Sequence, residues 1–158
     1  MKKKFIVDAM LGKLAKWLRI LGYDTLYFHD IDDHRLIEIA SREGRILLTG
    51  DRELMCYRWE GERLFVSSDL WQEQLYQAYH AFDLGTEGIF TRCIDCNQPL
   101  EQVAKQEVQG EVPTYVYHNQ RAFGRCPRCR KIYWQGTHFE KSTRRVEHIL
   151  NGKTSDNE

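Results

Sequence analysis

The chain has 158 residues, 42% of them hydrophobic and 12% aromatic, which is enough for one medium domain or for a domain with a smaller module. Basic and acidic residues balance at 23 each, so the formal net charge of +0 identifies no partner. No run approaches the roughly 18 apolar residues of a membrane helix, and we expect no membrane span. Charge is uneven only locally: residues 121–145 hold eight basic residues and one acid, Glu140, which makes them a candidate polyanion contact.

The sequence begins with MKKK, which looks like the basic start of a signal peptide. Asp8 follows the apolar residues 5–7 at once, so the hydrophobic region of about 7–15 residues that a signal peptide needs is missing. We therefore expect a cytoplasmic protein whose five cysteines are reduced, and clustered cysteines are then read as metal ligands before disulfides.

Strands and helices alternate through the first half of the chain. Short, continuous apolar runs are separated by segments whose apolar residues recur at helical spacing. Apolar strands of this kind are typical of a parallel sheet that is covered on both faces, so we expect an α/β fold with a parallel sheet flanked by helices. The expected strands are 4–7, 25–28, 45–49 and 64–67, and the expected helices are 10–21, 33–43, 51–59 and 69 to near Gly85.

The character of the chain changes near residues 83–88. From Gly88 onward the sequence contains four of the five cysteines and all three prolines, and its helical periodicity is weak. We therefore predict a first domain at 1–87, a small second module at 88–150 and a flexible polar tail at 151–158.

Two Cys-x-x-Cys pairs lie in the second module. Cys93 with Cys96, and Cys126 with Cys129, have the spacing that lets both thiolates of a pair reach one ion. Four thiolates complete a tetrahedral shell that suits structural zinc. The 29 residues between the pairs exceed the usual spacing of about 15–20. Two separate redox motifs are the alternative, but neither pair opens a helix after a strand.

Six aspartates follow the predicted strands. The carboxyl ends of parallel strands share one edge of the sheet, so these acids cluster there by topology. Converging carboxylates repel one another unless a cation lies between them, and hard oxygen ligands suit Mg²⁺ or Mn²⁺, which can activate water in phosphodiester cleavage. Each of these acids also precedes a predicted helix and can cap it, and spacing alone does not decide between the two roles. The acids are Asp8, Asp30, Asp32, Asp33, Asp51 and Asp69.

Three segments together resemble a known family. VDAMLGKLAKWLRILGYDT, DIDDHRLIEIASREGRILLTGDREL, and CIDC followed by CPRCRKIYWQGTHFE look like a PIN-like ribonuclease domain with a zinc ribbon. This is the family named after the carboxy-terminal domain of the Mut-seven exonuclease, and the likeness covers about residues 4–148. It implies a metal-dependent endoribonuclease in which Asp8, Asp33 and Asp51 are catalytic ligands of Mg²⁺ or Mn²⁺. Asp30, Asp32 and Asp69 are possible further ligands.

The sequence departs from the family pattern at two places. Gly50 stands where many related sequences have a basic residue. The fourth acid of a PIN nuclease has only Asp69 as a candidate here, and that residue is also well placed to cap the helix after it. The weak fourth acid motivates the alternative of a non-catalytic RNA- or ribosome-binding protein. A phospho-acceptor receiver is set aside, because Ala9 and Met10 follow Asp8 where a second acid is expected.

Basic residues supply the candidate RNA contacts. Lys13 and Lys16 lie on the predicted helix 10–21, where a solvated helix face is the alternative. Around the second cysteine pair, basic residues interleave with aromatic ones, which suits single-stranded RNA, although a small module also buries aromatic residues for its core. The residues of this second group are Arg125, Arg128, Arg130 and Lys131. The oligomeric state stays open.

Overall fold

The computed structural model describes residues 2–153, and its first half is a parallel α/β sheet. The four strands lie in the order β2-β1-β3-β4, and every neighbouring pair is parallel, which confirms the α/β prediction. No helix in this described range is both long and apolar enough to cross a membrane. The elements are β1 (Lys4–Val7), η1 (Ala9–Leu11), α1 (Gly12–Ile20), β2 (Asp24–Tyr27), α2 (Asp33–Glu43), β3 (Ile46–Thr49), α3 (Arg52–Met55), β4 (Arg63–Phe65) and α4 (Trp71–Ala81).

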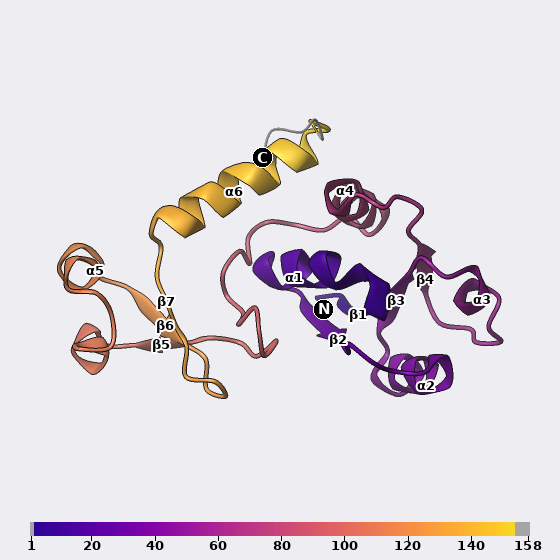
Figure 1. Cartoon of the computed structure of the whole chain (residues 1–158), viewed down its shortest axis with the longest axis horizontal. Helices are drawn as coiled ribbons and strands as arrows, with labels where there is room; N and C mark the ends of the chain where they lie inside the picture. The colour runs from indigo at the N-terminus through magenta and orange to yellow at the C-terminus, as the bar shows by residue number, and fades with distance from the viewer. Residues whose placement is uncertain (1, 154–158) are drawn as a thin grey trace.

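The sheet is buried on both faces, as its continuous apolar strands require. Phe5 and Val7 of β1 face α1 and α4, whereas Ile6 between them faces α2 and the short helix α3. Figure 1 shows α1 and α4 on one side of the sheet and α2 on the other. β1 lies in the interior of the sheet, and Val7 pairs with Tyr27 of β2 and with Leu48 of β3.

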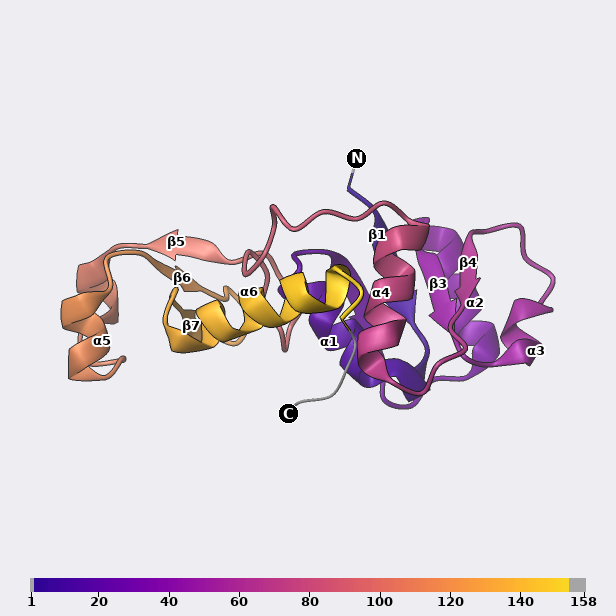
Figure 2. The same ribbon diagram turned by 90° about the horizontal axis from the view of Figure 1, so that it is seen from above.

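The second half forms a separate antiparallel sheet and a long helix. Its three strands lie in the order β5-β6-β7 over a small core of Val108, Val116 and Phe123. In Figures 1 and 2 this sheet lies at one end of the molecule, and α6 runs back toward α1 and α4. The elements are β5 (Glu101–Val103), η2 (Lys105–Val108), α5 (Thr114–Asn119), β6 (Phe123–Arg125), β7 (Ile132–Tyr133) and α6 (Thr137–Leu150).

Helix α6 was not expected from the sequence. Its buried residues Val146 and Ile149 belong to the same apolar cluster as α1 and α4, so the last helix completes the core of the first half. The division into 1–87 and 88–150 stays a prediction. Of the predicted tail, only residues 151–153 lie within the described range.

A buried asparagine connects the two halves. The side-chain oxygen of Asn97 accepts a hydrogen bond from the backbone N–H of Thr25 at 2.9 Å, and its amide nitrogen donates to Asp24 at 2.7 Å. Asp24 in turn accepts from the guanidinium of Arg45 at 2.8 Å. Burial by itself would raise the pKa of Asp24, but hydrogen bonds from Arg45 and Asn97 outweigh it and lower that pKa. The turn that carries Asn97 is thus fixed to β2.

Replacing Asn97 by Ala should lower the free energy of unfolding by about 1–3 kcal/mol, because a buried N–H and a carboxylate both lose a partner. Urea unfolding measures this loss, and amide hydrogen exchange should show faster exchange at Thr25. Gln98→Ala is the control, since Gln98 is the exposed neighbour. An unchanged unfolding midpoint in Asn97→Ala would show that the contact contributes nothing.

Candidate functional site

Three acids converge at the carboxyl edge of the parallel sheet. Asp33, Asp51 and Glu53 each offer an oxygen atom, and these atoms all lie within 4.8 Å of one another. Asp33 is the first residue of α2, Asp51 directly precedes α3, and Glu53 lies in the first turn of α3. The cluster therefore comes from two helix starts that the strands deliver to the same edge.

Asp8 is attached to this cluster through Thr49. The buried hydroxyl of Thr49 donates to Asp8 Oδ2 at 2.8 Å and accepts from the backbone N–H of Asp51 at 2.9 Å. The other oxygen of Asp8 accepts from the N–H of Ala9 at 2.8 Å. Asp8 thus caps η1, and it is also linked through Thr49 to the backbone of Asp51, although it is not one of the three clustered acids. Capping a helix therefore does not prevent Asp8 from lying next to a metal site.

The electrostatics of the cluster show uncompensated negative charge. Partial burial, and then the charges of Asp51 and Asp8, raise the pKa of Asp33 above its ordinary value. Across residues 2–153, no salt bridge reaches Asp8, Asp33, Asp51 or Glu53. Mutual repulsion of this kind is relieved by a bound cation, and three carboxylates are hard oxygen donors of the type that Mg²⁺ and Mn²⁺ prefer.

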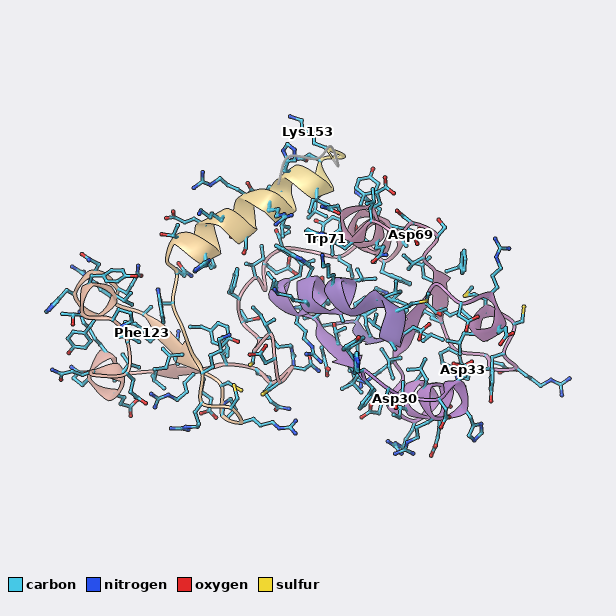
Figure 3. The ribbon with its side chains drawn as sticks, in the orientation of Figure 1. Asp30, Asp33, Asp69, Trp71, Phe123 and Lys153 are labelled. Carbon is cyan, nitrogen blue, oxygen red and sulfur yellow. The ribbon has the colours of Figure 1, made fainter. Side chains whose placement is uncertain are left out.

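The remaining predicted acids lie outside the three-acid group. Asp32 accepts a hydrogen bond from the backbone N–H of Arg35 at 2.8 Å and caps α2, so the side chain of Asp33 is not needed as the cap. Asp30 is exposed in the loop before α2. Asp69 is exposed beside α4, and Figure 3 shows it away from Asp33. The expected capping by Asp69 is not observed, because α4 has Leu70 at its N-cap position without a side-chain hydrogen bond.

Glu53 is the acid that sequence reasoning missed. Glu53 follows no strand directly, so the strand-end pattern does not select it. Its position two residues after Asp51, inside the first helical turn, is the sequence signal that points to it. The backbone N–H of Glu53 donates to Asp51 at 2.9 Å, so this local turn fixes the spacing of the two acids.

The four cysteines of the second half also converge. Their sulfur atoms lie within 4.8 Å of one another, and Cys93 and Cys126 are buried. In each pair the backbone N–H of the second cysteine points at the first sulfur, at 3.4 Å in both cases, from Cys96 and from Cys129. Four thiols with this arrangement are a donor set suited to zinc.

The two cysteine turns have the same backbone. Asn97 and Arg130 follow their pairs in the left-handed region, with φ of 63° and 69°. The backbone N–H of Cys93 donates to the carbonyl oxygen five residues on, Gln98 O, at 2.8 Å, and the N–H of Cys126 makes the equivalent bond to Lys131 O at 3.0 Å. The structure therefore holds two copies of one turn, facing each other across the sulfurs.

The thiols of the cluster shift in opposite directions: burial raises the pKa of Cys96, whereas the pKa of Cys126 is lowered. Burial would raise its pKa, but backbone donors from Cys129 and Arg128 outweigh burial and lower the pKa of Cys126 to about 7. The hydroxyl of Tyr133 donates to Cys93 at 3.3 Å. Tyr133 is therefore engaged with the cysteine cluster rather than free on the surface.

The predicted RNA contacts divide into exposed and buried residues. Arg125 is only 8% exposed and its guanidinium pairs with Glu111, so it is not available to RNA. Lys131 is exposed and pairs with Asp95 at 3.5 Å. The other candidates are all exposed: Lys13 and Lys16 on α1, and Arg128 and Arg130 in the second cysteine turn.

The sequence matches a known protein family over most of its length. The model of the Mut7-C RNAse domain matches residues 3–146. A human protein named Exonuclease mut-7 homolog is 34% identical over 101 residues, which cover 60% of this chain and 12% of the human protein. This chain therefore spans a small part of the length of that relative. No solved structure matches. The match over nearly the whole described chain shows that the protein belongs to the Mut7-C RNAse domain family.

Proposed function

We propose that this protein is a metal-dependent endoribonuclease that cleaves RNA phosphodiester bonds. The observation that carries the proposal is the convergence of Asp33, Asp51 and Glu53, which no salt bridge reaches within residues 2–153. Family membership supports a nuclease-type function. To this nuclease-type function we add three proposals: that the substrate is RNA, that the cleavage is internal, and that the metal is Mg²⁺ or Mn²⁺.

The acids have different roles in this proposal. Asp33, Asp51 and Glu53 would hold Mg²⁺ or Mn²⁺, and Asp8 is linked to them through Thr49, which also binds the backbone of Asp51. The ion supplies a Lewis acid that activates water and stabilises negative charge on the phosphodiester oxygens. Thr49 fixes Asp8 and the backbone of Asp51 at the same time, so the acids are held in place before RNA arrives.

The second half has a structural and a binding role in this proposal. Four cysteine sulfurs would fill the zinc shell completely, which leaves no open position for chemistry. The zinc ribbon would present RNA through exposed basic residues, which contact phosphates without reading sequence. These residues are Arg128, Arg130 and Lys131, with Lys13 and Lys16 of α1. We also propose a cytoplasmic location, where clustered thiols stay reduced.

The alternative is a non-catalytic RNA- or ribosome-binding protein. Its basis in the sequence was the weak fourth acid, Asp69. Glu53 now stands within 4.8 Å of Asp33 and Asp51, so the number of acids no longer argues against catalysis. Cleavage assays separate the two functions.

Replacing Asp51 by Asn should slow cleavage of single-stranded RNA in Mg²⁺ or Mn²⁺ by at least about hundredfold, because a metal ligand stabilises the transition state by several kcal/mol. Initial rates on a labelled oligoribonucleotide measure the effect. Asp69→Asn is the matched control, since it removes the same charge from an exposed acid outside the cluster. Equal rates for wild type and Asp51→Asn would refute the assigned site.

Replacing Asp33 by Asn should raise the melting temperature at neutral pH. The pKa of Asp33 is raised in the folded state, so its ionised form opposes folding. This cost is fully present above the folded pKa and disappears as the pH falls toward the unfolded value of 3.8. The difference in melting temperature between Asp33→Asn and the wild type should therefore disappear as the pH is lowered.

Divalent ions provide the second half of this test. Mn²⁺ should raise the melting temperature of the wild type by binding the folded state, and should do so much less in Asp33→Asn. Asp30→Asn, which changes an exposed acid of the neighbouring loop, should behave like the wild type. A wild type that is indifferent to Mn²⁺ would argue against a cation at these acids.

Replacing Cys126 by Ser should abolish zinc binding and lower the melting temperature. The second half has a small core of its own and depends on the metal for its order. Elemental analysis should give one zinc per wild-type chain and much less than one in the variant. Cys56→Ser is the control, because Cys56 is exposed and outside the sulfur cluster. Full zinc content in Cys126→Ser would contradict the four-sulfur site.

A further inference from the structure

Few large apolar side chains are exposed in the described part of the chain, and two of them follow strands at the edge of the sheet that carries the acids. Met10 is the middle residue of η1, two residues after Asp8, and Phe28 follows the last residue of β2. Single exposed apolar residues are ordinary, so position is what matters here. The exposed set consists of Met10, Phe28, Leu70, Tyr76 and Tyr115.

Met10 lies against the turn that delivers Asp51. Its sulfur is so close to Gly50 that a Cβ atom at Gly50 would stand 3.2 Å away from it. The side chain is nevertheless 65% exposed. The absence of a side chain at residue 50 therefore leaves room for the thioether to lie over the turn, beside the acids and open to solvent.

Strand register places Phe28 on the other side of Asp8. Val7 pairs with Tyr27, so the next residues along the two neighbouring strands are Asp8 and Phe28. Side chains alternate between the faces of a sheet, and Leu26 of β2 packs in the cluster on the α2 face. Phe28, two residues beyond Leu26 and the first residue past β2, is 37% exposed where the chain leaves the strand toward Asp33 and α2.

The edge of the sheet that carries the acids thus also carries an exposed thioether, against Gly50, and an exposed aromatic residue, directly after β2. Neither side chain is buried in the sheet core. Aromatic rings stack on unpaired nucleobases whatever their sequence, and the polarizable sulfur of methionine makes favourable contacts with aromatic rings. In a duplex the bases are already stacked on one another and are not free for such contacts.

We propose that Met10 and Phe28 form a base-stacking platform that selects unpaired RNA. The bases on either side of the phosphodiester held at the acids stack on these two side chains. The inference rests on the proposed ribonuclease function and adds a basis for its specificity: single-stranded RNA binds and double-stranded RNA does not.

The test measures binding and cleavage separately. Fluorescence anisotropy of a labelled, unstructured oligoribonucleotide, with Ca²⁺ in place of Mg²⁺, gives the affinity, and initial rates in Mn²⁺ give KM and kcat. Phe28→Ala should weaken binding by about 5- to 150-fold, the usual effect of losing one stacked base, and should raise KM more than it lowers kcat. Met10→Ala should have a smaller effect in the same direction.

Matched variants separate stacking from structure. Phe28→Tyr keeps an aromatic ring and should retain wild-type affinity. Tyr115→Ala removes a ring that is 69% exposed on α5, and should change nothing. The melting temperature of each variant shows whether it is folded.

Removing one base of the RNA tests the contact itself. When a base is removed at each position of the oligonucleotide in turn, the affinity of the wild type should fall most at one or two positions. At one or more of these positions, removing the base should not change the affinity of Phe28→Ala. The proposal is overturned if Phe28→Ala binds RNA like the wild type, or if the affinity that Phe28→Ala loses is the same on abasic RNA as on intact RNA. It is also overturned if duplex RNA binds the wild type as tightly as single-stranded RNA does. RNA bound but never cleaved would reject the nuclease function alone, whereas cleavage with no effect at Phe28 would reject the platform alone.

Discussion

The site depends on the parallel pairing of β1 with a strand on each side. Because β2 and β3 both run in the direction of β1, all three strand ends reach one edge, and the chain leaves each of them toward a helix. The backbone N–H of Asp8 still donates to Leu48 at 3.0 Å, so the acid belongs to the hydrogen-bonded ladder rather than to a loop. One hydroxyl, that of Thr49, then sets the positions of Asp8 and Asp51 together.

The second half is held to this sheet at a different place. The guanidinium of Arg19 on α1 donates to Thr25 O and to Ile94 O, both at 2.9 Å, and so joins the end of α1, β2 and the first cysteine turn. These contacts lie near the amino end of β2, whereas the acids lie at its carboxyl end. The attachment therefore leaves the acidic edge open.

Sequence patterns were reliable where local chemistry determines the structure. The helix expected at 33–43 is α2, Asp33–Glu43, because an Asp cap and Gly44 in the left-handed conformation mark its two ends. The helix expected at 51–59 is shorter, Arg52–Met55. The cysteine pairs converge as their spacing predicted.

Contacts between distant segments were not predictable in the same way. Helix α6 buries Val146 and Ile149 against helices of the first half, and its own sequence does not show that partner. Arg125 stands in a basic stretch, yet it is buried and pairs with Glu111, which lies before α5. Glu53 joins the acids only because a short helix turns it back toward Asp33. In each case the missing information is tertiary.

The two cysteine turns are equivalent toward a metal ion but not toward the rest of the protein. Glycine would adopt the left-handed backbone at residues 97 and 130 with less strain than any other residue. At residue 97, however, glycine would delete the amide that binds Thr25 and Asp24. The side chain of Asn97 therefore makes the two turns different, because it attaches the first cysteine turn, and not the second, to β2. Exchanging the two turns would keep four sulfurs in the cluster but would lose the hydrogen bonds between residue 97 and both Thr25 and Asp24.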